Sequence, residues 1–195
     1  MANYPPAVYH LDNDETTIRD LIFECKPHRS NPKSRWISPQ VHNGVLTLHT
    51  KLHPLVINYI ADDRKSLLVR LDDPLLHSIL VEVEAKVKAA SPAPVATQTL
   101  INYDTSERYP DSLKLKCEFT KWIDANTDEE IDVGAALSSK RNRITSWVLQ
   151  VYRLNEYKGK WYFAIMLHSA KVSRAAEESE LGGKRKREED LTQYL

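Results

Sequence analysis

Three short stretches of the chain combine Lys or Arg with aromatic residues. They are Lys33-Ser-Arg35-Trp36, then Lys140-Arg141-Asn-Arg143 ahead of Trp147 and Tyr152, and Tyr157-Lys158-Gly-Lys160-Trp161-Tyr162. A single-stranded nucleic acid is bound by cations that hold its phosphates and by aromatic rings on which its bases stack. We therefore expect phosphate contacts from Lys33, Arg35, Lys140, Arg141, Arg143, Lys158 and Lys160, and base stacking on Trp36, Tyr157 and Tyr162. The alternative, that these aromatic residues only pack against the protein, stays open at this point.

The charges are distributed unevenly, although 27 Lys and Arg balance 27 Asp and Glu. No acidic residue lies between Cys25 and Ala61, and Glu156 is the one acid between Val133 and Ala176. If these two basic segments share a face of the fold, that face attracts phosphate while the molecule as a whole stays neutral. The sequence leaves open whether they share one.

Other kinds of chemistry find little support in the sequence. The Asp124–Glu130 segment begins like a calcium loop, but it has Glu129 at the sixth position and Ala135 at the twelfth, so we expect a solvated turn. Cys25-x-x-His28, with His42, His49 and His53 downstream, lacks the paired spacing of a zinc site. No glycine-rich phosphate loop, nucleophile elbow or metallopeptidase motif occurs. We therefore predict no catalytic residues, no metal and no cofactor.

Composition and termini predict one domain with two extensions. The 42% of hydrophobic residues suits a globular domain, and no apolar run is long enough for a membrane span, so we expect no membrane partner. We predict a flexible arm over residues 1–14, without the features of a signal peptide, a domain over 15–173 and a disordered tail over 174–195. The two cysteines, Cys25 and Cys117, are expected to be buried thiols in a reducing compartment.

The tail has two halves of opposite charge. Its basic block, Lys184, Arg185, Lys186 and Arg187, suits importin and predicts a nuclear location. A solvated run of charge is the alternative. The acidic end from Glu188 to Leu195 is a candidate for recruiting replication proteins.

The pattern within the domain is mostly that of strands. We expect a short strand or a helical turn over 17–24, a proline-rich loop over 26–40, and a hairpin-like strand over 41–52 that turns at Asn43-Gly44. Further strands are expected over 55–60, 66–71 and 113–123, and a hairpin over 144–154 and 161–172. In its return strand, Trp161, Phe163, Ile165 and Leu167 are expected to face the core, and Tyr162, Met166 and His168 to face outward.

One helix is expected in the middle of the chain. Asp73 supplies an N-cap, Pro74 fits the first helical position, and apolar residues recur at helical spacing from Leu75 to Val87. The stretch from Val81 to Lys88 also alternates as a strand would, but the cap favours the helix. A linker follows over residues 89–97.

The order of these elements resembles that of a known family. Val45-Leu-Thr-Leu-His-Thr50, the helix to Val87, Tyr109-Pro-Asp-Ser-Leu-Lys-Leu-Lys116 and the closing strand from Gly159 follow one another as in the OB-fold-like single-stranded DNA-binding proteins of large eukaryotic DNA viruses. The chain departs from that pattern at His53-Pro54-Leu55-Val56-Ile57, where an aromatic-glycine pair would be expected.

We expect a mainly β fold: an antiparallel OB-like barrel with one inserted helix and a disordered C-terminal tail. The resemblance implies sequence-independent binding of single-stranded DNA in replication, repair or recombination. A viral structural or matrix-like protein, or a nuclear module that binds proteins and no nucleic acid, is the alternative from another class. A hydrolase is the third.

Overall fold

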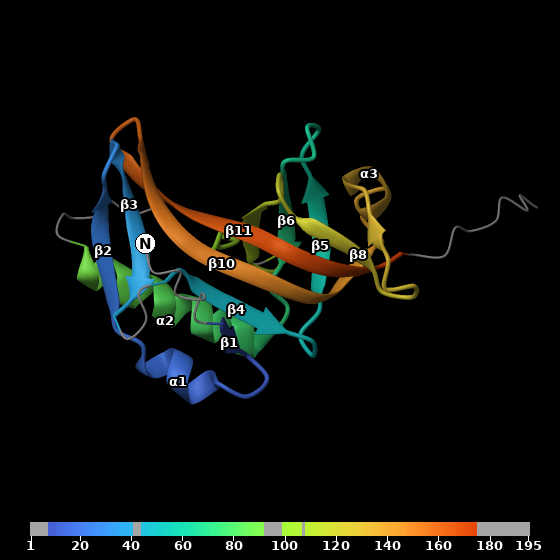
Figure 1. Cartoon of the computed structure of the whole chain (residues 1–195), viewed down its shortest axis with the longest axis horizontal. Helices are drawn as coiled ribbons and strands as arrows, with labels where there is room; N and C mark the ends of the chain where they lie inside the picture. The colour runs from blue at the N-terminus through green and yellow to red at the C-terminus, as the bar shows by residue number, and fades with distance from the viewer. Residues whose placement is uncertain (1–7, 41–43, 92–98, 107, 175–195) are drawn as a thin grey trace, which may run out of the picture.

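Five strands close into a barrel in the computed structural model, which describes residues 8–40, 44–91, 99–106 and 108–174 (Figure 1). The closing strands are β5 (Leu55–Ile60), β6 (Ser66–Arg70), β7 (Ser112–Lys116), β10 (Arg143–Tyr157) and β11 (Lys160–Ser173). Pairing runs β10–β5–β6–β7–β11 and returns to β10, and all contacts are antiparallel except β7–β11, which is parallel. The fold is therefore mainly β and OB-like, as predicted, although its sheet is mixed.

The β10–β11 hairpin is the longest feature of the fold. Its register runs from Arg143 opposite Ser173 to Tyr157 opposite Lys160, with irregularities at three points along β10. Bulges bend and twist a strand. The two strands accordingly curve across the whole molecule (Figure 1), and the predicted hairpin is confirmed.

The other edge of β10 is shared by three partners in succession. Its first residues pair with β5, residues 147–151 pair with β4 (Leu46–Thr50), and residues 153–155 pair with β3 (Asn31–Pro39). Strand β2 (Phe23–His28) extends the sheet beyond β3, and β1 (Val8–His10) adds to β4 in parallel. On the far side, β8 (Lys121–Asp124) and β9 (Glu130–Ile131) extend the sheet from β11.

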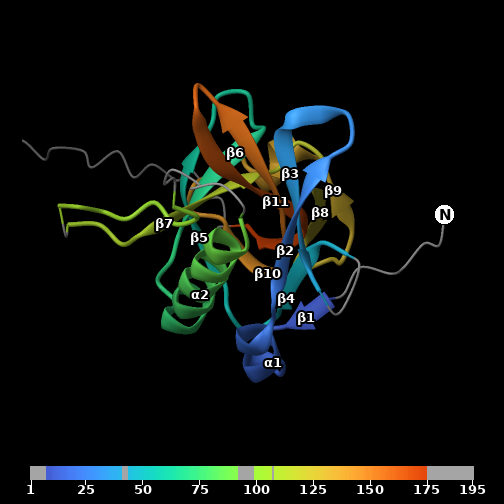
Figure 2. The same ribbon diagram turned by 90° about the vertical axis from the view of Figure 1, so that its left-hand side faces the viewer.

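The predicted helix is α2 (Pro74–Ala90), and it begins as the sequence indicates. The Asp73 carboxylate accepts hydrogen bonds from the amides of Leu75 and Leu76 at 2.8 and 3.1 Å. The apolar stripe from Leu76 to Val87 is buried, and Figure 2 shows α2 on one side of the molecule, next to β2. Two short helices, α1 (Glu15–Asp20) and α3 (Val133–Ala136), complete the described elements.

Three expectations about local structure were wrong. Residues 26–40 are largely strand rather than loop, because Pro27 lies in the outer edge strand and Pro32 lies in the irregular stretch between the paired residues Asn31 and Arg35, where a missing N–H is tolerated. The N-terminal segment predicted to be flexible, residues 1–14, includes β1, and the buried side chains of Tyr9 and Leu11 belong to the core. Residues 1–7 lie outside the described part of the chain. The expected strand over 113–123 is interrupted by a turn, which leaves Phe119 79% exposed.

The core combines the barrel interior with the contact between α2 and the sheet. Both cysteines are free; Cys117 is buried and Cys25 partly buried. Among the described residues, no helix is both long and apolar enough to cross a membrane. The predicted linker, apart from its first residues, and the tail beyond Arg174 lie outside the described residues.

Candidate nucleic-acid interface

One end of the molecule is a projecting four-stranded sheet, which we call the arm. It consists of β2 and β3 (residues 23–39) together with residues 152–164 of the β10–β11 hairpin. It stands at the upper left in Figure 1, with the tips of both hairpins pointing the same way. The arm contains seven Lys and Arg but only two acids, Glu24 and Glu156, so this end of a neutral protein is strongly cationic.

Trp36 lies near the base of the arm, where β3 pairs with β10. Arg153 is its cross-strand partner, and the guanidinium carbon lies 4.4 Å from the centroid of the indole. The ring of His28 stacks on Trp36, with centroids 5.1 Å apart and planes 29° apart. The Tyr152 ring lies 6.3 Å from Trp36 and 5.2 Å from the Arg153 guanidinium. Four side chains from β2, β3 and β10 thus form one group of three rings and a cation.

A bulge in β10 creates this group. The pairing of β10 with β11 is irregular between Val151 and Arg153, so Tyr152 is an extra residue in the strand. Because of the extra residue, Val151 and Leu154 are both buried while Tyr152 and Arg153 between them are partly exposed. In strict alternation, one of the two would point into the core.

The opposite face of the arm is mixed in character. Toward its base Cys25 packs near α2, where its thiol lies 3.7 Å from the Val87 carbonyl, and burial raises the pKa of that thiol. Toward the tip, the Arg35 guanidinium lies 5.4 Å from the centroid of the Trp161 ring. This face is therefore part of the core near the base of the arm, and it carries a second cation–aromatic pair near the tip.

The tip of the β10–β11 hairpin is a two-residue turn. Lys158 and Gly159 have φ angles of 50° and 77°. Positive φ at both positions suits the right-handed twist of a hairpin, and glycine adopts it without strain. The turn presents Lys158 and Lys160 to solvent, and Tyr157, 62% exposed, lies with its ring 5.2 Å from the Lys158 ammonium.

Most cations of the arm have no acidic partner in the part of the chain that the structure describes. Among the described residues, ion pairs involve Lys26 with Glu24 at 2.6 Å and Lys33 with Glu156 at 3.7 Å. Within that same description no ion pair is formed by Arg35, Arg153, Lys158 or Lys160. Arg35, Arg153 and Lys158 lie over aromatic rings, and cations without carboxylate partners are available to an external anion.

The predicted residues divide into two groups rather than one. Lys33, Arg35, Trp36, Tyr157, Lys158, Lys160 and Tyr162 lie on the arm, whereas Lys140, Arg141 and Arg143 lie at the opposite end of β10. The second group includes an aromatic residue of β5, since the Lys140 ammonium lies 5.5 Å from the Tyr59 ring. At about 3.3 Å per residue, the two ends of β10 are at most about 46 Å apart.

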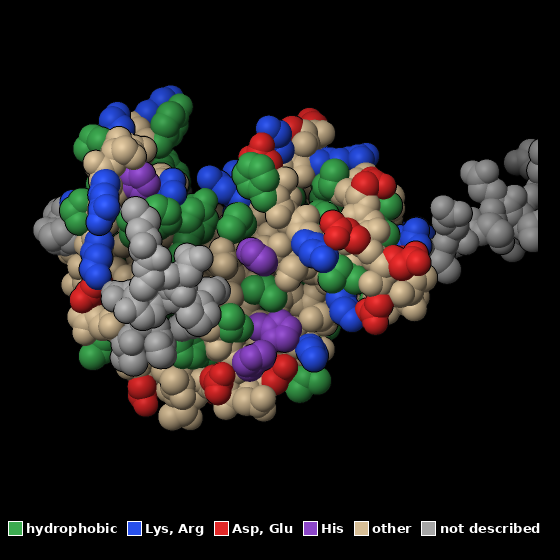
Figure 3. Space-filling view, in the orientation of Figure 1, with side chains coloured by type: hydrophobic (Ala, Val, Ile, Leu, Met, Phe, Trp, Pro, Cys, Tyr) green, Lys and Arg blue, Asp and Glu red, His purple; other side chains and the backbone are tan. Residues whose placement is uncertain are grey.

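The outline of the molecule in Figure 3 is concave between the arm and a second projection, which Figure 1 identifies as the β5–β6 turn and α3. Lys and Arg side chains are visible on both projections, although acids accompany them on the second. The arm is thus the more strongly cationic part of the site.

Several contributors were not predicted. The predicted residues are contacted by four others, His28, Tyr152, Arg153 and Trp161. Trp147 instead is buried, and its indole nitrogen donates a hydrogen bond to the His53 carbonyl oxygen at 2.7 Å. Tyr152 and Arg153 are adjacent and interrupt the alternation of apolar residues in β10, and this interruption is the feature of the sequence that could have indicated their exposure.

In the described part of the chain, no group of three or more His, Cys, Asp or Glu could hold a metal ion. The import block 184–187 lies outside it.

Comparison with known proteins finds distant structural similarity. No protein-family model matches the chain, and no curated protein matches it. The single-stranded DNA-binding protein from bacteriophage Enc34, solved in complex with single-stranded DNA, has a TM-score of 0.49 and 10% identity, over 81% of this chain and 97% of that one. The same phage protein solved alone gives 0.48 and 12%, over 81% and 96%. The resemblance to proteins of large eukaryotic DNA viruses stays a prediction.

Proposed function

We propose that the protein binds single-stranded DNA through the arm, without preference for sequence. The observation that carries this proposal is a set of cations without acidic partners among the described residues, Arg35, Arg153, Lys158 and Lys160, alongside the rings of Trp36, Tyr152, Trp161 and Tyr157. Unpaired cations attract phosphates, and neighbouring rings give the bases surfaces to stack on.

The side chains of the arm favour a single strand over a duplex. Stacking on a protein ring needs an exposed base face, which a duplex hides between neighbouring base pairs. Aromatic rings and cations bind every base through its face or its phosphate, so no sequence preference is expected. The role of the group at Lys140, Arg143 and Tyr59 is to continue the phosphate path beyond the arm.

A titration with labelled oligonucleotides tests the proposal. The protein is expected to bind a 20–30-nucleotide single strand at low salt, more tightly than a duplex of the same length, and to lose affinity steeply as salt rises. Strands of different composition should bind alike. Equal affinity for duplex and single strand would refute the stacking argument, and absence of binding at low salt would refute the function.

The cellular role and location are proposed from the sequence. A protein that coats exposed strands would act in DNA replication, repair or recombination, with importin recognising 184–187 and replication proteins recognising the acidic end. Deletion of residues 182–195 should lower the nuclear fraction of a tagged protein and leave the described fold intact. Identical distributions of full-length and truncated protein would show that the basic block is not an import signal in that cell.

A further inference from the structure

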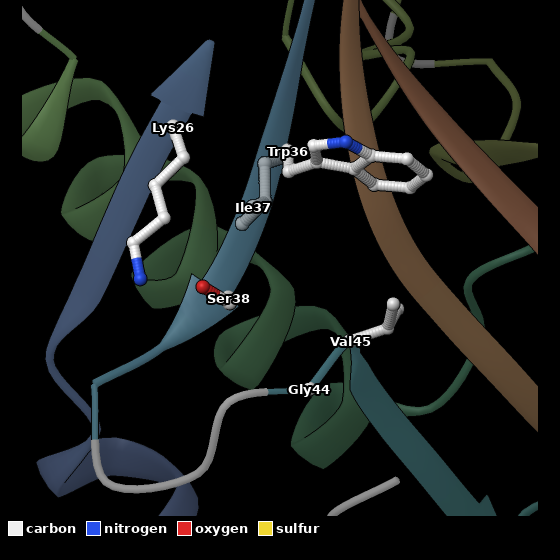
Figure 4. Close-up of a pocket in the computed structure, with 6 residues that line it drawn as sticks. All are labelled: Lys26, Trp36, Ile37, Ser38, Gly44 and Val45. Atoms are coloured by element: carbon white, nitrogen blue, oxygen red, sulfur yellow. The ribbon is translucent and has the colours of Figure 1, made fainter. Parts of the chain in front are cut away.

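A hollow of about 340 Å³ opens beside Trp36, between β3 and the start of β4. It is lined by Lys26, Trp36, Ile37, Ser38, Gly44 and Val45. Figure 4 shows the indole of Trp36 extending over one side and Val45 on the other, with Ser38 at the edge and Lys26 on the neighbouring strand. Its walls are mostly apolar, and the polar side-chain groups of the lining residues are the Ser38 hydroxyl, the Lys26 ammonium and the Trp36 indole N–H.

The hollow exists because β3 and β4 lie along the same edge of β10. Residues 147–151 of β10 pair with β4, and residues 153–155 pair with β3, so the bulge at Tyr152 falls between the two partners. Two strands that follow one another along a bent edge diverge at the bend. The gap is therefore part of the barrel-to-arm junction and is framed by hydrogen-bonded strands.

We propose that this hollow receives one unstacked base of the bound strand, seated between Trp36 and Val45. The inference rests on the proposed function and names a specific subsite within it. The hollow adjoins the Trp36–Arg153 pair, so a strand whose phosphate meets Arg153 passes its rim. The Lys26–Glu24 pair is exposed, so the ammonium is free to exchange its carboxylate for a phosphate.

The chemistry of the walls suits a base of any identity. A base has apolar faces that fit between an indole and a valine side chain, and a hollow of about 340 Å³ is large enough to admit one. The Ser38 hydroxyl either donates or accepts a hydrogen bond, so it satisfies a donor or an acceptor on the base edge. One base therefore accounts for the character of these walls, without a larger occupant such as a dinucleotide or a drug-like ligand.

Two oligonucleotides and two filling variants test the inference. The probes are a 20-nucleotide thymidine strand and a strand of the same length made of abasic sugar-phosphate, which keeps every phosphate and lacks every base. Val45→Phe fills the hollow from β4, and Ser38→Leu fills it from β3; neither removes a cation. Val81→Phe, the same enlargement at an exposed position of α2, is the matched control.

The expected result is a loss of base-dependent affinity alone. Stacking of one base changes affinity by about 5-fold or more. Either filling variant should therefore reduce the preference for the thymidine strand by at least about 5-fold and leave the affinity for the abasic strand unchanged. The control should change neither.

Each of the remaining outcomes contradicts the inference for a different reason. If the filling variants keep the full preference for the thymidine strand, bases stack elsewhere and the hollow is not a base subsite. If they weaken both strands equally, the substitution acts on the cations of the arm. If the unaltered protein binds neither strand, the proposed function fails and the subsite fails with it.

Discussion

Removal of the two lysines at the hairpin tip should change the salt dependence of DNA binding by a defined amount. Lys158 and Lys160 are exposed and form no ion pair among the described residues. Each phosphate contact on a single strand contributes about 0.7 to the slope of log affinity against log salt concentration. Lys158→Ala with Lys160→Ala should therefore flatten the slope by about 1.4.

The change in slope corresponds to a measurable change in affinity. Between 50 and 200 mM salt, the double variant should lose about 7-fold less affinity than the unaltered protein. Fluorescence anisotropy at four or five salt concentrations gives the slope. The effect should be the same for strands of different sequence, because phosphate contacts are sequence-independent.

A matched variant separates lost contacts from lost charge. Lys65→Ala with Lys121→Ala removes the same charge, but each of these lysines is paired with an acid, Glu118 at 2.9 Å and Glu130 at 3.3 Å. This control should leave the slope close to that of the unaltered protein. The reasoning is refuted if the tip variant keeps the original slope, or if both variants flatten it equally.

Three further outcomes are expected from the fold itself. Asp73→Ala removes the cap of α2 and should destabilise the protein by about 1–2 kcal/mol in urea unfolding, whereas Asp72→Ala, exposed and paired with Arg70, should change stability little; equal effects would refute the cap. Burial raises the pKa of Cys117 to about 11, so its alkylation at pH 8 should be far slower in the folded protein than in urea, and equal rates would contradict the burial. Burial and the neighbouring His10 lower the pKa of His49, so the folded state binds fewer protons; the free energy of unfolding should fall as pH drops below about 6.5, and less so in His49→Asn.

The barrel strands and α2 were predictable because their signals are local. The cap at Asp73-Pro74, the turn after Ile60 and the two apolar runs joined at Gly159 each specify an element without reference to the rest of the chain. The hairpin of β2 and β3 was not predictable in this way. Its prolines indicate a loop locally, and only the tertiary position at the edge of β10 makes them compatible with strands.

Only part of the candidate site was predictable, because the rest also depends on tertiary contacts. The residues at Trp36 and Lys158 stand out as types, but their presence in one sheet depends on the pairing of β3 with β10, which joins segments about 120 positions apart. The division of the basic residues into two groups follows from the length of β10. The role of Arg153 depends on a bulge, which shifts the alternation by one residue; the sequence shows that interruption at Tyr152-Arg153, but not the contact with Trp36 that results.

The bulge at Tyr152 also determines where the length of β10 can change during evolution. Val151 and Arg153 pair with the adjacent residues Ile165 and Ala164, so loss of Tyr152 alone would leave a regular strand in which Leu154 still points inward, without the bend and without the Tyr152 ring. Loss of one residue between Arg153 and Tyr157 would instead reverse the facing of the residues beyond it. Matched changes of two residues in both β10 and β11 keep every side chain on its face and only move the tip. Homologues with longer or shorter arms should therefore differ by even numbers of residues in each strand beyond Tyr152.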